Sequence, residues 1–105
     1  MGGLDQFWQK QLVSIMGFDW NEANQTKNYF KHAVSWQEAE EIFANQPLLI
    51  LPDQQHSKNE IRYYALGRTN QNKQLLIVFT IRQNLIRVIS ARNQNKKERQ
   101  TYAKI

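Results

Sequence analysis

Apolar residues in the first half of the chain recur at helical spacing between residues 36 and 44. Glutamate and glutamine occupy the positions between them, as on the solvent face of an amphipathic helix. Four residues form the apolar face: Trp36, Ala39, Ile42 and Phe43. Ser35 and Glu38 have the spacing of a capping box and Pro47 marks the end of the pattern, so a helix is predicted here.

Two further helices are predicted from capping residues and uninterrupted polar stretches. Asp19 and Glu22 also have capping-box spacing, and residues 21–32 contain neither glycine nor proline. Residues 95–103 are polar, basic and free of glycine, which favours a short terminal helix.

From residue 48 the period changes from helical to strand-like. Four strands are predicted, over residues 48–51, 61–69, 75–81 and 85–91. The second alternates, the third is apolar almost throughout and is expected at the centre of a sheet, and the fourth is expected to place Ile86, Val88 and Ser90 on one face. Gln83 and Asn84 fit a two-residue hairpin turn.

Connections this short between successive strands allow only antiparallel pairing. The predicted fold is therefore α+β, with two N-terminal helices, a four-stranded antiparallel meander sheet and a short C-terminal helix, and with the helices gathered on one face. A chain of 105 residues is long enough for one hydrophobic core and too short for two domains.

The charges divide unevenly along the chain. Residues 58–105 hold eleven Lys and Arg against two acidic residues, whereas residues 1–57 hold three against seven, within a net charge of +5. A basic half of this kind fits a surface for a polyanion such as RNA or DNA, although a solubilising surface would have the same composition.

Several classes of protein are excluded by composition. The absence of cysteine rules out disulfides, zinc ribbons and thiol nucleophiles. No apolar stretch is long enough to span a membrane, and residues 1–5 do not resemble the start of a secretion signal. We therefore expect a soluble, cytoplasmic protein.

Arginine carries the remaining candidate chemistry. RNA breaks when its 2′-hydroxyl attacks the adjacent phosphate, which requires a base, an acid and positive charge but no obligatory metal. Arg82 and Arg92 lie near predicted strand ends, where they are expected to converge on one anion. The titratable candidates are Glu60, His32 and His56. Each also has a structural alternative: an ion pair for Glu60, a helix C-terminus for His32 and an ordinary loop for His56.

Several segments, in order along the chain, resemble the BrnT family of toxins. They are Lys31-His32-Ala33-Val34-Ser35, Pro52-Asp53 with His56-Ser57, Glu60-x-Arg62, Phe79-Thr80-x-Arg82, Ile89-Ser90-Ala91-Arg92 and Glu98-Arg99-x-x-Tyr102. The resemblance runs from about Phe18 to Tyr102. It implies a fold like that of the RelE and ParE toxins and a ribonuclease activity that blocks translation. It also implies a partner antitoxin called BrnA, a ribbon-helix-helix protein whose complex with the toxin represses its own operon.

The same resemblance implies roles for individual residues. The catalytic residues would be His32, Glu60, Arg62, Arg82 and Arg92. Of these, the three arginines would hold the scissile phosphate, and His32 or Glu60 would act as base or acid. The RNA-binding residues would be Lys31, Arg68, Arg87, Lys96, Lys97 and Arg99. No metal, cofactor or membrane is expected to take part, and DNA would be contacted only through the antitoxin complex.

The chain departs from the family pattern at three positions and at its N-terminus. Ala33 replaces a glycine, which would cost about 1 kcal/mol if the helix ends there in a left-handed conformation. Asn24 and Gln94 replace the usual Lys and Ala, so a weakened or inactive toxin is an alternative. Residues 1–15 have no counterpart and are expected to be a loosely attached or non-native extension of a single domain formed by residues 16–105.

Two other functions remain as alternatives. The ParE toxins use the same architecture as non-catalytic inhibitors of a topoisomerase. A basic nucleic-acid-binding module would bind in a salt-dependent way without toxicity. RNA cleavage in the presence of a chelator separates a ribonuclease from both.

Overall fold

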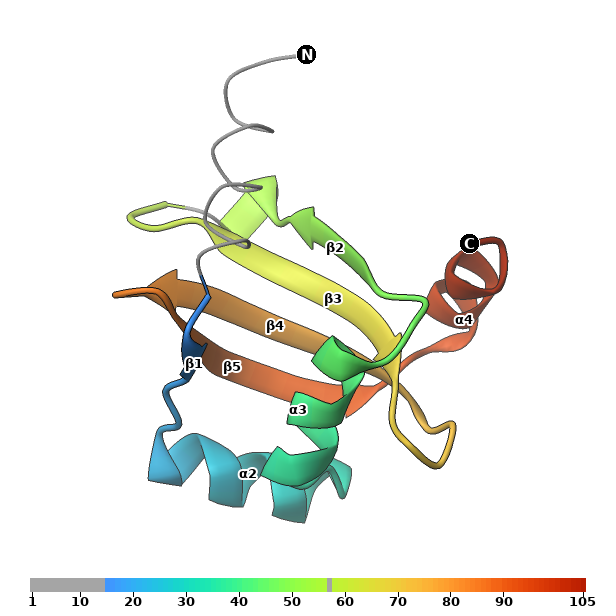
Figure 1. Ribbon diagram of the computed structural model, residues 1–105, viewed down its shortest axis with the longest axis horizontal. Helices are drawn as coiled ribbons and strands as arrows, with labels where there is room; N and C mark the ends of the chain where they lie inside the picture. The colour runs from blue at the N-terminus through green and yellow to red at the C-terminus, as the bar shows by residue number, and fades with distance from the viewer. Residues whose placement is uncertain (1–14, 57) are drawn as a thin grey trace.

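The computed structural model describes residues 15–56 and 58–105, and it shows one sheet with helices packed on both of its faces (Figure 1). The elements in chain order are β1 (Gly17–Phe18), α2 (Glu22–His32), α3 (Trp36–Ala44), β2 (Leu49–Pro52), the 3-10 helix η1 (Gln54–His56), β3 (Arg62–Arg68), β4 (Gln74–Arg82), β5 (Leu85–Asn93) and α4 (Lys96–Ala103). The predicted α+β class is confirmed. The predicted extension lies outside the described residues except for Ile15, which packs against the main core.

Strands β2 to β5 form the antiparallel meander that the sequence predicts, in the sheet order β1-β5-β4-β3-β2. The prediction of four strands is wrong, because β1 adds a fifth strand that runs parallel to β5. The backbone N–H groups of Met16 and Asp19 donate to the carbonyls of Asn84 and Ile86, both at 2.8 Å. A strand of two residues is too short to show alternation in a sequence, which is why it was not predicted.

The two N-terminal helices begin at polar caps. Asn21 is the N-cap of α2, and its side chain accepts two backbone N–H groups. The predicted cap at Asp19, paired with Glu22, is therefore wrong, because Asp19 still belongs to the pairing of β1 with β5. The capping box of Ser35 and Glu38 at the start of α3 is confirmed.

Helices α2 and α3 lie over one face of the sheet, and Ala39 and Ile42 of α3 form the main core with it. α3 approaches β3 closely at Gly67, where an added Cβ would lie 2.9 Å from the Cβ of Ile42. α4 lies on the opposite face, where Tyr102 packs against Leu66 and Leu76. The prediction that all helices gather on one face is therefore wrong. We call the face of β2–β5 that points away from α2 and α3 the open face.

A bulge in β5 changes which of its side chains reach the open face. Phe79 pairs with Val88 and Val78 with Ser90, so one residue of β5 has no opposite partner. Val88 and Ala91 both enter the main core as a result. The predicted grouping of Ser90 with Val88 is therefore wrong, because the alternation shifts by one residue at the bulge.

Two asparagines hold α2 against β5 beyond the short pairing with β1. The Asn24 side chain donates to the carbonyl of Val88 at 3.4 Å, and the backbone N–H of Ala91 donates to Oδ1 of Asn28 at 3.3 Å. These side chains satisfy backbone groups of β5 where no strand of the described sheet does so.

Candidate functional site

The strand register places charged residues in a row across one end of the open face. The backbone N–H of Asp53 donates to the carbonyl of Arg62 at 2.6 Å, which brings these two residues side by side. Arg62 pairs with Thr80, and Thr80 with Arg87. The row therefore contains Asp53, Arg62, Thr80 and Arg87, contributed by four neighbouring segments of chain.

A second pair extends this group toward the β4–β5 hairpin. The guanidinium of Arg82 donates two hydrogen bonds to the carboxylate of Glu60, at 2.7 and 3.0 Å. The hydrogen bond from Arg82 holds the pKa of Glu60 below its ordinary value of 4.5, and the charge of Arg87 acts in the same direction. The pKa of Arg82 is raised by the same contact. Glu60 is therefore a carboxylate at neutral pH, able to accept a proton but not to supply one.

His56 lies beside these residues, although it was not among the predicted site residues. A hollow of about 360 Å³ is lined by His56, Lys58, Asn59, Glu60 and Arg62. The imidazole is 61% exposed, and its Nδ1 lies 2.8 Å from Oδ2 of Asp53, whose side chain is 22% exposed. The signal in the sequence was the spacing of Asp53 and His56, which η1 turns into a contact.

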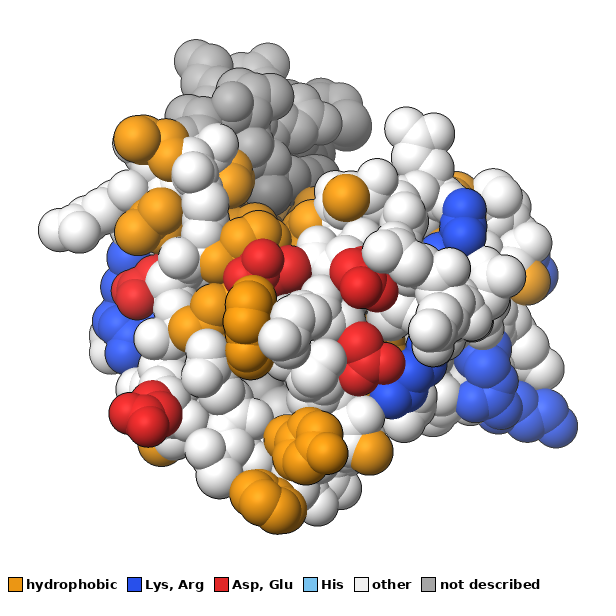
Figure 2. Space-filling view, turned by 60° about the horizontal axis from the view of Figure 1, so that its bottom comes forward, with side chains coloured by type: hydrophobic (Ala, Val, Ile, Leu, Met, Phe, Trp, Pro, Cys, Tyr) orange, Lys and Arg blue, Asp and Glu red, His pale blue; other side chains and the backbone are white. Residues whose placement is uncertain are grey.

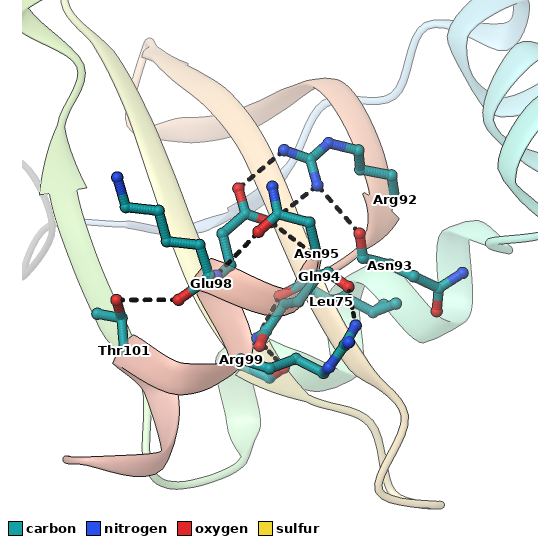
Figure 3. A network of polar contacts seen from close by, with 10 residues as sticks. Leu75, Arg92, Asn93, Gln94, Asn95, Glu98, Arg99 and Thr101 are labelled. Atoms are coloured by element: carbon teal, nitrogen blue, oxygen red, sulfur yellow. Dashed lines mark hydrogen bonds and ion pairs between the residues drawn. The ribbon is translucent and has the colours of Figure 1, made fainter.

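Arg92 lies at the opposite end of the sheet and is held by α4 (Figure 3). Its guanidinium donates to both carboxylate oxygens of Glu98, at 2.8 and 2.9 Å, and to the carbonyl of Asn93 at 3.0 Å. This contact raises the pKa of Arg92 and lowers that of Glu98. Glu98 also forms a capping box with Asn95 at the start of α4. Arg92 therefore joins the end of β5 to the first turn of α4.

The register contradicts the expectation that Arg82 and Arg92 converge on one anion. Arg92 is opposite Leu76, which precedes Arg82 by six residues on the same strand. At the usual rise of about 3.3 Å per residue the separation along β4 is about 20 Å, too far for one phosphate to contact both side chains.

His32 also lies away from Glu60. It ends α2, and the next residue, Ala33, accepts a hydrogen bond of 2.8 Å from the Nζ of Lys73. Lys73 comes just before β4, whereas Glu60 contacts the last residue of β4, Arg82. These two contacts lie about 30 Å apart along the strand. The predicted catalytic residues therefore divide into two groups, with Glu60, Arg62 and Arg82 together and His32 and Arg92 elsewhere.

The predicted RNA-binding residues are spread over the molecule in the same way. Arg87 belongs to the row described above. Arg68 and Arg99 donate to backbone carbonyls of Gln46 and Gln94 respectively, so both guanidinium groups have structural contacts. The remaining three are Lys31, on α2, and Lys96 and Lys97, on α4. Lys97 lines a largely apolar groove of about 390 Å³ between the open face and α4.

The face formed by α2 and α3 has a different character. Figure 2 shows acidic and apolar side chains across this face, with lysine and arginine toward its margins. Its acidic residues are Glu22, Glu38, Glu40 and Glu41. The arginines of the row and these four glutamates therefore lie on opposite sides of the sheet.

Within residues 15–56 and 58–105, no group of three or more His, Cys, Asp or Glu residues could hold a metal ion. Over the same residues, no helix is long and apolar enough to cross a membrane.

Comparisons with known proteins connect this geometry to a family. The family described as "Ribonuclease toxin, BrnT, of type II toxin-antitoxin system" matches residues 20–98. The crystal structure of the Brucella abortus ribonuclease toxin BrnT is similar in fold, with a TM-score of 0.58 and 21% sequence identity. That likeness covers 77% of this chain and 99% of the Brucella chain. No curated protein matches the sequence.

Proposed function

The chain belongs to the BrnT family of ribonuclease toxins of type II toxin–antitoxin systems, and on that premise we propose that it is a metal-independent endoribonuclease. In this proposal the active site lies at the hairpin end of the open face, which is the end next to the hairpin between β4 and β5. The observation that carries the proposal is the group formed by Glu60 and Arg82 beside the row containing Arg62 and Arg87. This group joins a carboxylate that can accept a proton to three guanidinium groups on one surface.

These residues supply what cleavage of RNA requires. Attack of the 2′-hydroxyl on phosphorus produces a phosphorane whose extra negative charge needs fixed positive charge around it. Arg62 and Arg87 lie on either side of Thr80 and can hold the phosphate, while Glu60 takes the proton of the 2′-hydroxyl. The products are a 2′,3′-cyclic phosphate and a 5′-hydroxyl.

The proposed site does not include His32 or Arg92. Arg92 is occupied by Glu98 and acts to hold α4 in place. The three departures from the family pattern also lie elsewhere: Asn24 and Ala33 belong to α2 and its end, and Gln94 is buried beside the carbonyls of Gly67 and Leu75. The departures therefore give no reason to expect an inactive enzyme.

In the cell, the activity proposed here blocks translation in the cytoplasm and is neutralised by an antitoxin of the BrnA type, a ribbon-helix-helix protein. The family's description as a type II toxin supports a protein antitoxin. The exposed guanidinium of Arg82, beside the half-buried Arg62 and Arg87, supports an acidic segment of that partner as the group that covers the site and excludes RNA. DNA would be contacted only through the antitoxin complex.

Cleavage of RNA by the purified protein in excess chelator tests the proposal. Wild type is expected to cut, and Arg62→Ala and Arg82→Ala are expected to lower the rate about 100-fold, because each removes a donor from the developing charge. Lys27→Ala removes one exposed positive charge from α2 on the other side of the sheet and is the matched control. Its rate is expected to equal that of wild type.

Intact RNA with the wild-type protein would contradict the proposal. It would leave a non-catalytic inhibitor of the ParE type or a basic nucleic-acid-binding module as the function. Cleavage that the chelator abolishes would contradict metal independence alone.

A further inference from the structure

We propose that His56, oriented by Asp53, is the general acid that protonates the leaving 5′-oxygen during RNA cleavage. This inference rests on the ribonuclease function proposed above. It adds a proton donor, a role that Glu60 cannot fill because it is already a carboxylate. It assigns to His56 the role of acid, which the predicted catalytic set left open between His32 and Glu60.

The contact between the two side chains fixes the orientation of the imidazole. Asp53 Oδ2 accepts from Nδ1 of His56 at 2.8 Å, which leaves Nε2 as the nitrogen that can present a proton to a ligand. The contact therefore fixes which ring nitrogen faces the hollow, as a positioned proton donor requires. His56 is exposed enough for a substrate to reach, and Asp53 is largely covered.

The backbone places this pair next to the arginines. Asp53 is anchored by its N–H on the carbonyl of Arg62, and the N–H of His56 donates back to the carbonyl of Asp53 at 3.3 Å. The 3-10 turn therefore keeps His56 beside Asp53, just after β2, with its imidazole accessible to a ligand.

Base and acid line the same hollow. The charged groups that face His56 are Asp53, Lys58, Glu60 and Arg62, and the last three line the hollow with it. His56 and Glu60 lie four residues apart on the connection between β2 and β3, and a phosphate bound by Arg62 would lie in the hollow that both of them line. A base and an acid positioned beside one phosphate can serve its two reacting oxygens.

The step is balanced in atoms and charge. The 2′-oxygen forms a bond to phosphorus as its proton passes to Glu60, and the bond from phosphorus to the 5′-oxygen breaks as that oxygen takes the proton of His56 Nε2. Glu60 leaves the step protonated and His56 neutral, and exchange of protons with water restores both.

The test uses a short RNA spanning a site that the wild-type protein cuts. His56→Asn is expected to lower kcat about 100-fold with KM within about threefold, because removal of a general acid affects the transition state and not ground-state binding. A matching RNA with sulfur in place of the leaving 5′-oxygen needs no protonation of its leaving group. On this substrate the kcat of His56→Asn is expected to lie within about threefold of the wild-type value.

Three further variants test whether the effect of the sulfur substrate is specific to the proton donor. Asp53→Asn tests a positioning residue. Its kcat is expected to fall about 10-fold on ordinary RNA and to return toward the wild-type value on the sulfur substrate. Glu60→Gln lacks the base, so its kcat is expected to be low on both ordinary RNA and the sulfur substrate. Gln55→Asn changes the middle of the same 3-10 turn and is expected to match wild type.

The outcomes distinguish the two proposals. Wild-type protein that does not cut RNA overturns the ribonuclease function itself. Wild-type protein that cuts, with His56→Asn cutting equally fast, overturns the role of His56 alone. A slow His56→Asn that the sulfur substrate does not restore also overturns it, since the side chain would then act in binding or folding. Thermal unfolding of each variant confirms that it is folded.

Discussion

Ala33 ends α2 with φ 55° and ψ 36°, the left-handed conformation that favours glycine. The sequence predicted this strain, because Ala33 stands where the resemblance places a glycine. The backbone N–H of Ala33 donates to the carbonyls of Asn28 and Tyr29, so the conformation serves to close the helix. A single position thus connects a departure from a family pattern to a measurable cost in stability.

Ala33→Gly is expected to raise the free energy of unfolding by about 1 kcal/mol, because it removes the contact between Cβ and backbone in the left-handed region. Ala23→Gly, in the first turn of the same helix, is the control and is expected to lower stability by a similar amount. Urea unfolding of the three proteins measures both changes. A loss of stability in Ala33→Gly would show that the helix end is not strained.

At the same scale, the sequence identified candidate residues but not which of them lie together. Glu60 was expected to be either a catalytic group or the partner of an arginine, and its contact with Arg82 is compatible with both. Arg92 was grouped with Arg82 because both lie near strand ends, although the predicted hairpin at Gln83 and Asn84 places these two strand ends at opposite ends of the sheet. His56 was a titratable candidate but was not placed in the catalytic set, because its contact with Asp53 depends on the 3-10 turn.

At the scale of elements, one side chain, Glu98, both forms the ion pair that joins α4 to β5 and takes part in the cap at the start of α4. Glu98 accepts from Arg92 on β5 and from the backbone N–H of Asn95 at the helix start. Tyr102 anchors the other end of α4, where its hydroxyl donates to the carbonyl of Pro47 at 2.6 Å. The helix therefore depends on the charge of Glu98 in its first turn and on apolar burial in its last.

Glu98→Gln tests this arrangement, since glutamine retains the cap but lacks the charge. The folded-state pKa of Glu98 is lowered, so its stabilisation is complete above its ordinary value of 4.5 and is lost as the pH falls through the lower folded-state value. At pH 7 the variant is expected to be less stable by on the order of 1 kcal/mol. At pH 3 the difference from wild type is expected to shrink.

Urea unfolding at the two pH values measures the effect. Glu22→Gln, an exposed carboxylate in the first turn of α2, is the control. If Glu98→Gln lowers the free energy of unfolding by the same amount at pH 3 and pH 7, the ion pair with Arg92 does not stabilise α4.

The elements that the sequence predicted correctly are those whose signals are local. The strands of the meander, the hairpin at Gln83 and Asn84, and the start of α3 follow from alternation, turn residues and capping. The elements it missed depend on distant partners. β1 exists because β5 offers an unpaired edge, the bulge in β5 is visible only in the register with β4, and α4 lies on the open face because Leu66 and Leu76 provide apolar contacts there.

Over the whole molecule, the division of charge along the sequence becomes a division between two faces. Four glutamates of the first half, Glu22, Glu38, Glu40 and Glu41, lie on α2 and α3, whereas Arg62 and Arg87 of the second half lie in the row on the open face. This arrangement was predictable in outline, because the helices come first in the chain and the strands follow. The row proposed as part of the active site was not predictable, because only the register gathers Asp53, Arg62, Thr80 and Arg87.

The central claim is that RNA binds at the hairpin end of the open face. Amide chemical shifts of the ¹⁵N-labelled protein, titrated with a 2′-O-methyl RNA that cannot be cleaved, test it most directly. The largest changes are expected at residues 53–62 and 80–87, with small changes on α2. Changes centred on His32 and the start of α4, or on the exposed surface of α2 and α3, would contradict the claim.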